Sequence, residues 1–353
     1  MGILHIFNPE HDIALASNLS NFTAPHAGRQ LRGDLGYLPS LWSNPGDAVY
    51  VDHVEYASRA WSRLSKRIHA TLGINVPSDI RFIQAKTNER QFDGITAIDP
   101  WGWDKALVAT LHRQGVSPEL LPNDAYLDNV RQQSHRRAAS RLLPLLRMEG
   151  TVGESFECTS VDEVRSLLLR YGHIVMKAPW SSSGRGVRFL AIDSKQLSVD
   201  NWISNVVKLQ GSIMVEPYYN KVKDFGMEFC QTEQGIHYLG LSLFHTVNGA
   251  YTGNIIATEN WKRDYLSRYI SVELLDSVKE KIINLLRLGD YRGCFGVDMM
   301  VCAGSLLHPC VEINLRRTMG HVALALSPTD DDIVKVMRIS LTDHYRLSLT
   351  SMR

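Results

Sequence analysis

The sequence predicts an α/β protein in which short apolar strands alternate with helices. Apolar runs bounded by turn residues recur along the chain, and amphipathic segments of helical period separate them. Two strand–polar loop–helix units occur within the first 130 residues, which is typical of an open α/β sheet. The chain has 353 residues, 44% of them hydrophobic, which is enough apolar side chain for more than one core.

Charge and composition exclude several classes of protein. The 38 basic and 37 acidic residues leave a net charge of +1, which argues against a general nucleic-acid binder. The sequence contains no run of 18 apolar residues, so it predicts no membrane-spanning helix. The N-terminus does not resemble an export signal. The five cysteines show no zinc-binding spacing. We therefore expect a cytoplasmic protein with reduced thiols and no membrane partner.

The first two units each place a polar loop after a strand. Residues 4–7 predict a buried strand and residues 13–16 the opening of a helix, with the turn 8–12 between them. Residues 95–98 and 105–113 predict a second strand and helix around the loop 99–104. Ligands of open α/β sheets gather at the carboxyl ends of strands, so both loops are candidates to face a substrate. Turn formation and helix capping are the simpler explanation of residues 8–12.

Further elements follow along the chain. Residues 124–147 predict a helix, and Ser160 with Glu163 predicts a capping box at the start of a helix over 160–170. We predict strands at 173–178, 186–192, 213–217, 226–232, 237–245, 295–302 and 308–313, and a helix at 272–287. Three aspartates at 330–332 predict the start of a tail helix, because acidic side chains favour the positive end of the helix dipole, with metal binding as the alternative.

The strand at 173–178 carries Lys177 and leads into a loop of small residues. That loop contains Ser181, Ser182, Ser183, Gly184 and Gly186. Small residues let backbone N–H groups close over phosphate oxygens, and a nearby lysine adds a point charge. The segment predicts a phosphate site, with a solvated hairpin as the alternative. It matches neither the P-loop nor the dinucleotide-binding glycine pattern.

Two carboxylates, Asp298 and Glu312, interrupt otherwise apolar strands. Burial of a carboxylate is costly unless it is paired or binds a cation. An odd-numbered loop over 303–307 would place the two acids opposite each other in a hairpin, with Asn314 on the same face. Three oxygen ligands on one face suit Mg²⁺. The alternative is salt bridging of the acids to Arg292, Arg316 or Arg317.

The strand at 213–217 ends in Glu216-Pro217, which Tyr218 and Tyr219 follow. Such a strand can present backbone groups to a flat base, and a carboxylate farther on, Asp224, can hold ribose hydroxyls. An edge strand with a solvated turn is the simpler explanation of this segment on its own.

These segments occur in a fixed order over residues 125–325: the lysine with its Ser/Gly loop, the Glu-Pro strand, the strand aspartate, and Glu-x-Asn. In that order and spacing the sequence resembles the ATP-grasp superfamily of ATP-dependent ligases. The resemblance implies an ATP-grasp fold with an N-terminal open α/β domain over residues 1–124. Two α+β subdomains that clasp ATP would follow, over 125–212 and 213–353, the second with the magnesium site and the tail helix.

The resemblance also implies a role for each motif. Lys177 would contact the phosphates, and the Ser/Gly loop would cover them. The adenine hinge and ribose acid would be Glu216, Tyr218, Tyr219 and Asp224; the ligands of Mg²⁺ or Mn²⁺ would be Asp298, Glu312 and Asn314. Arg137 stands where many members carry another phosphate-contacting lysine, and Arg136 competes with it for that position.

The substrate side departs from part of the family. D-alanine–D-alanine ligases carry an arginine two residues before the strand aspartate, where this sequence has Gly296. Arg316 instead follows Asn314 at the spacing seen in biotin-carboxylase-like members. The expected catalytic arginines near the acyl phosphate are therefore Arg316, Arg317 and Arg292, with structural pairing as the alternative for each.

The chemistry implied by the resemblance is ATP-dependent ligation. A carboxylate attacks the γ-phosphate of ATP, and an amine then displaces phosphate from the acyl phosphate. The expected cofactors are ATP and Mg²⁺, and the expected partners are small-molecule or peptide-like carboxylates and amines, with a homodimer as one assembly. His245 and His321 are candidate bases by residue type only. The alternatives are a small-molecule kinase on the same fold and a nucleotide-binding regulatory protein without turnover.

Overall fold

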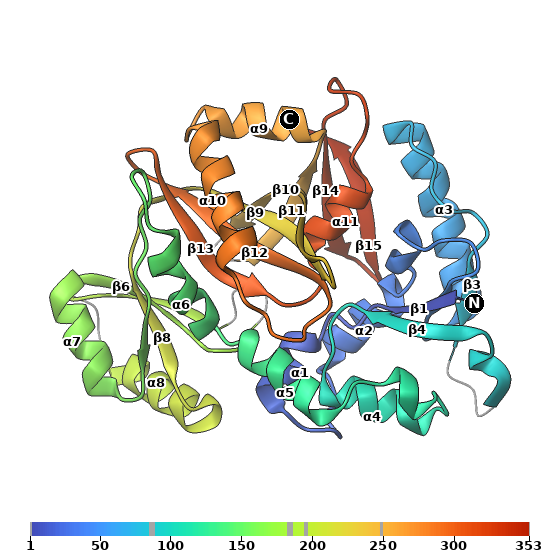
Figure 1. Ribbon diagram of the computed structural model, residues 1–353, viewed down its shortest axis with the longest axis horizontal. Helices are drawn as coiled ribbons and strands as arrows, with labels where there is room; N and C mark the ends of the chain where they lie inside the picture. The colour runs from blue at the N-terminus through green and yellow to red at the C-terminus, as the bar shows by residue number, and fades with distance from the viewer. Residues whose placement is uncertain (1, 85–88, 182–185, 194–196, 248–249, 353) are drawn as a thin grey trace.

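The computed structural model describes residues 2–84, 89–181, 186–193, 197–247 and 250–352, whose strands form three sheets (Figure 1). The N-terminal sheet is parallel, in the order β3-β2-β1-β4. Its strands are β1 (Gly2–Ile6), β2 (Ala48–Tyr50), β3 (Arg81–Ile83) and β4 (Ile95–Pro100). The helices of this region are α1 (His11–Ser17), α2 (His26–Leu35), α3 (Val54–Leu72), α4 (Lys105–Arg113) and α5 (Asp124–Gln133). Short 3-10 helices lie at Leu38–Leu41, Glu89–Phe92 and Pro118–Leu120.

The second sheet is antiparallel, in the order β5-β8-β6-β7. Its strands are β5 (Phe156–Cys158), β6 (His173–Lys177), β7 (Val187–Ala191) and β8 (Ile213–Pro217). Helices α7 (Val161–Tyr171) and α8 (Leu197–Gln210) pack on it through Val164, Leu168 and Ile203. Ser160 caps α7, because its side chain accepts a hydrogen bond from the backbone N–H of Glu163. The second half of the predicted capping box differs, because the Glu163 carboxylate accepts the backbone N–H of Thr159 and not that of Ser160.

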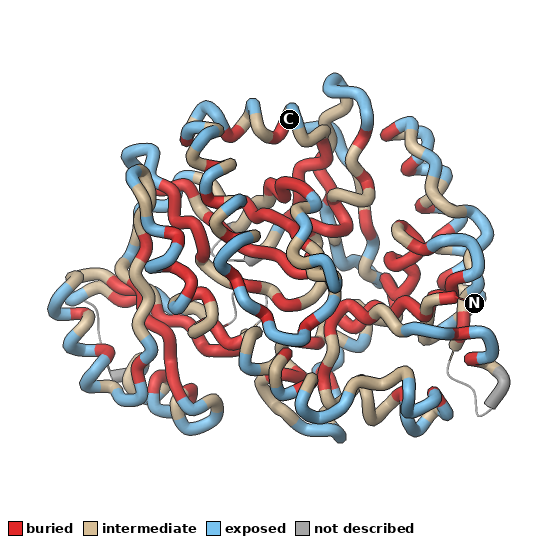
Figure 2. The backbone as a smooth tube through the Cα atoms, in the orientation of Figure 1, coloured by how far each residue is buried: buried red, intermediate tan, exposed pale blue. Residues whose placement is uncertain are grey.

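The third sheet has seven strands in the order β13-β12-β9-β10-β11-β14-β15. They are β9 (Lys221–Thr232), β10 (Gly235–Val247), β11 (Ala250–Ile256), β12 (Gly293–Cys302), β13 (Leu306–Asn314), β14 (Lys335–Leu341) and β15 (Tyr345–Ser351). The accompanying helices are α6 (Arg137–Leu146), α9 (Glu259–Ser267), α10 (Val272–Leu285) and α11 (Met319–Ala325). Apolar side chains of β9, β12 and β13 pack with α6 and α10 in the main core, and the strands are correspondingly buried (Figure 2).

The three sheets follow the three segments expected from the sequence, with one exception. Strand β8 completes the second sheet, although it begins at residue 213, where the last segment was expected to start. The domain boundaries themselves stay a prediction. The helix expected over 124–147 is two helices, α5 and α6, separated at residues 134–136.

The predicted tail helix is wrong. The segment after the three aspartates forms the hairpin β14–β15, which extends the third sheet by pairing with β11. Its apolar residues Val336, Met337 and Leu347 are buried on the edge of that sheet, and this burial outweighs the local preference of aspartates for a helix start. Sequence reasoning also missed β11 and α11. Within the described part of the chain, no helix has the length and apolarity needed to cross a membrane.

Candidate active site

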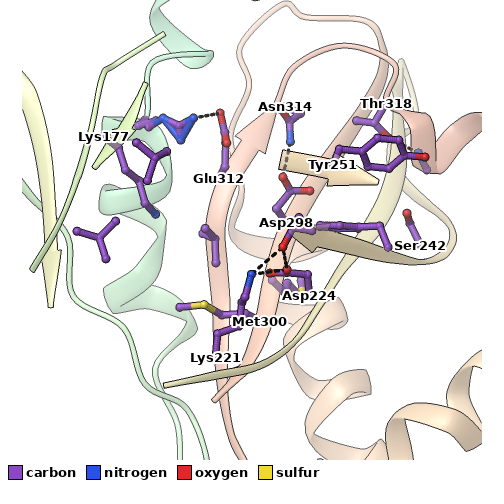
Figure 3. A pocket seen from close by; sticks show the side chains of 18 of the residues that line it. Lys177, Lys221, Asp224, Ser242, Tyr251, Asp298, Met300, Glu312, Asn314 and Thr318 are labelled. Atoms are coloured by element: carbon purple, nitrogen blue, oxygen red, sulfur yellow. Dashed lines mark hydrogen bonds and ion pairs between the residues drawn. The ribbon is translucent and has the colours of Figure 1, made fainter. Parts of the chain in front are cut away.

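A cavity of about 430 Å³ lies between the second sheet and the third (Figure 3). One wall carries Lys177 and the end of β8, and the other carries the first half of β9, the middle of β12 and the end of β13. The sequence-predicted residues that line it are Lys177, Ser181, Glu216, Tyr218, Tyr219, Asp224, Asp298, Glu312, Asn314 and Arg316. Residues up to 139 positions apart in the sequence, from Lys177 to Arg316, thus share one cavity.

The hairpin of β12 and β13 places Asp298 directly opposite Glu312, as the sequence predicts. The turn itself is shorter than expected, because Cys302 pairs with Leu306. A register shift between Asp298 and Met300 restores the predicted pairing. The shift falls beside Pro309, which has no N–H to donate to a regular ladder.

Two cross-strand rows arise from this register. Glu312, Asp298 and Gly226 are neighbours across β13, β12 and β9. Asn314, Gly296 and Glu228 form the next row on the same face. The side-chain amide of Asn314 donates a hydrogen bond of 3.0 Å to Asp298 Oδ2, which ties the two rows together.

The site concentrates negative charge in a buried place. Burial, followed by the nearby carboxylates of Glu312 and Glu228, raises the pKa of Asp298 to about 8. Burial also raises the pKa of Glu312, although the Arg136 guanidinium opposes that shift from 2.9 Å. Within the described residues, no three His, Cys, Asp or Glu side chains form a metal cluster. The donor set is therefore two carboxylates and one amide, a hard oxygen set that fits Mg²⁺ together with phosphate oxygens and water.

Lys177 faces this set from the second sheet. Its Nζ lies 2.6 Å from Glu216 Oε2, and both side chains are buried. Strands β6 and β8 are antiparallel neighbours, and this pairing brings the two residues together. Glu216 therefore pairs with the lysine, which positions the ammonium group at the edge of the cavity.

The remaining nucleotide-side residues surround an apolar slot. Val175, Val187 and Phe189 line one side of it, and Met300 and Val311 line the other. Tyr218 stacks on His173 with ring centroids 4.0 Å apart, at the mouth of the slot. Asp224 accepts hydrogen bonds from Lys221 and Thr246 on the same wall. These contacts leave a flat apolar space with polar groups at its rim, which suits a purine and its sugar.

The Ser/Gly loop is described only at its ends. Ser181 lines the cavity, and its hydroxyl accepts a hydrogen bond from Arg136. A Cβ at Gly186 would lie 2.4 Å from the Ser181 Cβ, so this close approach requires glycine. Ser182, Ser183 and Gly184 lie outside the described residues, and the predicted cover over the phosphates stays a prediction.

Of the two adjacent arginines, Arg136 and not Arg137 reaches the cavity. Arg136 is buried and contacts Glu312 and the backbone carbonyl of Ala178. Arg137 points away and pairs with Glu157 at 2.8 Å. Successive residues at a helix start lie about 100° apart around the axis, so only one of them can face the cavity.

The three candidate catalytic arginines separate in space. Arg316 lines the cavity and is held by a bidentate contact with Asp12, at 2.8 and 2.7 Å. Arg317 points to the N-terminal sheet, where it pairs with Asp99 at 2.7 Å and stacks over Trp42. Arg292 does not line the cavity; its guanidinium donates to the carbonyl of Tyr291. Of these three arginines, only Arg316 is placed to act on a ligand in this cavity.

The sequence reasoning missed Glu228, which is 2% exposed and lines the cavity. The same signal that identified Asp298 applies to it, because Glu228 also interrupts an apolar strand between Met227 and Phe229. His321 takes a structural role: its Nδ1 accepts the backbone N–H of Thr318 in a capping box at the start of α11. His245 does not line the cavity.

Comparison with solved structures identifies the fold. The structure resembles N5-carboxyaminoimidazole synthetase from Staphylococcus aureus, solved with ADP: the TM-score is 0.53 at 12% identity, over 96% of this chain and 82% of that one. An Archaeoglobus fulgidus protein assigned to the ATP-grasp superfamily matches with a TM-score of 0.51 at 12% identity, over the full length of both chains. L-amino acid ligase from Bacillus licheniformis matches with a TM-score of 0.51 at 12% identity, over 97% of this chain and 82% of that one.

The chain therefore has the ATP-grasp fold, as the sequence predicts. Neither protein-family models nor curated proteins give a match to this sequence.

Proposed function

We propose that this protein is a Mg²⁺-dependent ATP-grasp ligase that activates a substrate carboxylate as an acyl phosphate for attack by an amine. The observation that supports this most directly is the shared cavity, where Lys177 faces Asp298, Glu312 and Asn314. The L-amino acid ligase among the solved structures of the same fold supports the class of reaction.

In this proposal the chain mainly positions reactants and offsets charge. Lys177 and Arg136 hold the phosphate oxygens, and the apolar slot beside Tyr218 holds adenine. Asp298, Glu312 and Asn314 hold Mg²⁺, which neutralises charge on the phosphates when bound. Arg316 offsets charge on the reacting carboxylate, and Asp12 fixes the orientation of its guanidinium.

Enclosure of the cavity also serves this chemistry. An acyl phosphate is hydrolysed by water, so a ligase must keep water away from it. Glu228 and Thr318 line the cavity and are themselves buried, so the protein encloses the end of the cavity that they form. Ser181, at the start of the Ser/Gly loop, also lines the cavity.

The experiment is a screen of carboxylate and amine pairs with ATP and Mg²⁺, which detects ADP release and the mass of the product. Formation of an amide together with ADP and phosphate supports the proposal. A stable phosphorylated product would identify a kinase instead. Binding of ATP without turnover for any pair would identify a nucleotide-binding regulatory protein.

A further inference from the structure

A buried carboxylate closes the inner end of the cavity, and the roles above do not use it. Glu228 is surrounded by hydroxyl and amide groups that also line the cavity. We name this group the Glu228 pocket; it consists of Glu228, Ser242, Tyr251, Asn254 and Thr318. Figure 3 shows Ser242, Tyr251 and Thr318 on the side of Asp298 opposite Lys177.

Glycines make room for the Glu228 carboxylate. A Cβ at Gly320 would lie 1.9 Å from Glu228 Oε1, and a Cβ at Gly296 would lie 2.6 Å from Oε2. Any side chain at either position would displace the carboxylate. The space is thus shaped around a charged group that is costly to bury without a cationic partner.

The hydrogen bonds around the carboxylate run in one direction. Tyr251 donates to Asn254 Oδ1, and the Asn254 amide donates to Ser242 Oγ. Because Ser242 Oγ accepts that bond, its hydroxyl proton is available to donate to Glu228. Burial raises the pKa of Glu228, and the hydrogen bonds from Thr318 and Ser242 oppose that rise. The network supports Glu228 as an acceptor, while its Oε2 is buried without a hydrogen-bond partner in the described part of the chain.

Protein cations near Glu228 are engaged elsewhere. Arg316 is bound by Asp12 and Asn314. Lys262 donates to the carbonyl of Leu241 and lies 3.7 Å from Glu259. Among the described residues no lysine or arginine forms an ion pair with Glu228; His321 Nδ1, at 3.0 Å, already accepts the N–H of Thr318.

The pocket lies close to the reacting end of the proposed nucleotide. Glu228 is one strand across and two residues along from Asp298 on the same face. With ordinary strand spacing and rise, the two backbones are about 8 Å apart. A small substrate that contacts Glu228 can therefore place a second group beside the phosphates.

We propose that the Glu228 pocket binds an ammonium group of a substrate. This inference rests on the proposed ligase function and specifies the charge of its substrate. The ammonium group is carried either by the carboxylate substrate, as in an amino acid, or by the amine that attacks. The ammonium group then supplies the cationic partner that Glu228 lacks, and it donates charge-assisted hydrogen bonds to Glu228 Oε2.

The test measures binding to the full chain by calorimetry, in the presence of Mg²⁺ and a non-hydrolysable ATP analogue. The probes are the amino acids, the 2-hydroxy acids with the same side chains, ethanolamine and 1,4-diaminobutane. Wild-type protein is expected to bind ammonium probes and to reject the hydroxy acids. Binding of amino acids identifies the carboxylate substrate as the carrier, and binding of the two amines alone identifies the nucleophile.

The variant Glu228→Gln keeps the shape and removes the charge, so ammonium binding is expected to fall by about 10- to 100-fold. Glu228→Asp is expected to keep the preference for ammonium over hydroxyl. The control Glu280→Gln removes an exposed carboxylate on α10 and is expected to change nothing. If Glu228→Gln does not fold, the wild-type protein tests the inference by itself, through its binding of amino acids compared with the matching 2-hydroxy acids.

The inference is overturned if hydroxy acids bind as tightly as amino acids, if Glu228→Gln binds ammonium probes like the wild type, or if no ammonium probe binds. If the ATP analogue does not bind but the ammonium probes do, the ligase proposal is refuted and the proposal that the Glu228 pocket binds ammonium is retained. Tight binding of the analogue without ammonium selectivity would refute only the pocket.

Discussion

Replacement of Lys177 by methionine tests whether the proposed phosphate site depends on a buried ion pair. Lys177 Nζ and Glu216 Oε2 are 2.6 Å apart, and their side chains are 7% and 6% exposed. Loss of one partner leaves an uncompensated charge in the interior, which costs about 3–5 kcal/mol. A lysine that only contacts phosphates could be removed without loss of the fold, whereas the buried ion pair predicts a loss of stability as well as of ATP turnover.

The measurement is urea unfolding of Lys177→Met, Glu216→Gln and the double variant, followed by tryptophan fluorescence and circular dichroism. The single lysine variant is expected to unfold at a urea concentration about 1–2 M lower than the wild type. The double variant is expected to recover most of that stability, because neither charge is left alone. ADP release is expected to fall by about 10²–10³ whenever Lys177 is absent, whatever the stability.

The control is the exposed pair Asp264 and Arg268, whose side chains are 76% and 64% exposed. Arg268→Met is expected to change the unfolding free energy by less than about 1 kcal/mol, as is usual for surface pairs. The reasoning is refuted if Lys177→Met is as stable as the wild type. It is also refuted if the double variant is as unstable as the lysine variant.

Three further predictions follow from the same contacts. Asp298→Asn should lower ADP release by about 10²–10³ without loss of stability by urea unfolding. Burial and the facing Glu312 raise the pKa of Asp298 to about 8, so the neutral amide resembles the protonated carboxyl in charge and shape. Normal turnover in the folded variant would contradict the metal role. Arg136→Gln should lower turnover and Arg137→Gln should not, since only the first contacts the cavity; equal effects in the same ADP-release assay would contradict this. Burial, with help from nearby arginines, lowers the pKa of His135 to about 3. Its contribution to stability is therefore complete above about pH 6.5 and is lost toward pH 3, at up to about 1.4 kcal/mol per pH unit. The slope of unfolding free energy against pH should flatten in His135→Gln, and an unchanged slope would contradict the assignment.

The hairpin of β12 and β13 shows what sequence reasoning can reach. The cost of burying Asp298 and Glu312 identified both acids, and strand alternation placed them opposite each other. The turn length was wrong by two residues, and the irregularity beside Pro309 compensated for it. The pairing was predictable because it depends on which face is buried, whereas the turn depends on local backbone geometry.

Neighbouring arginines show where such reasoning stops. Arg316 and Arg317 follow a strand, where successive side chains point to opposite sides, so one reaches the cavity and the other the N-terminal sheet. The sequence predicts that the two side chains point in opposite directions, but it does not predict which of them faces the ligand. Arg136 and Arg137 pose the same problem at the start of α6, and only the packing of that helix against β13 decides it.

The N-terminal region contributes to the site through Arg316. Asp12, in the helix that follows β1, holds Arg316, and Asp99, near the carboxyl end of β4, holds Arg317. Burial by itself would raise the pKa of Asp12, but the charge and hydrogen bonds of Arg316 outweigh it, so its pKa lies below the usual value. Asp12 thus orients Arg316 from outside the set of residues that line the cavity, and Asp99 holds Arg317, which does not line it either. Because both contacts join segments more than 200 residues apart, the first sheet orients the arginine that the third sheet presents, and neither sheet could form this part of the site alone.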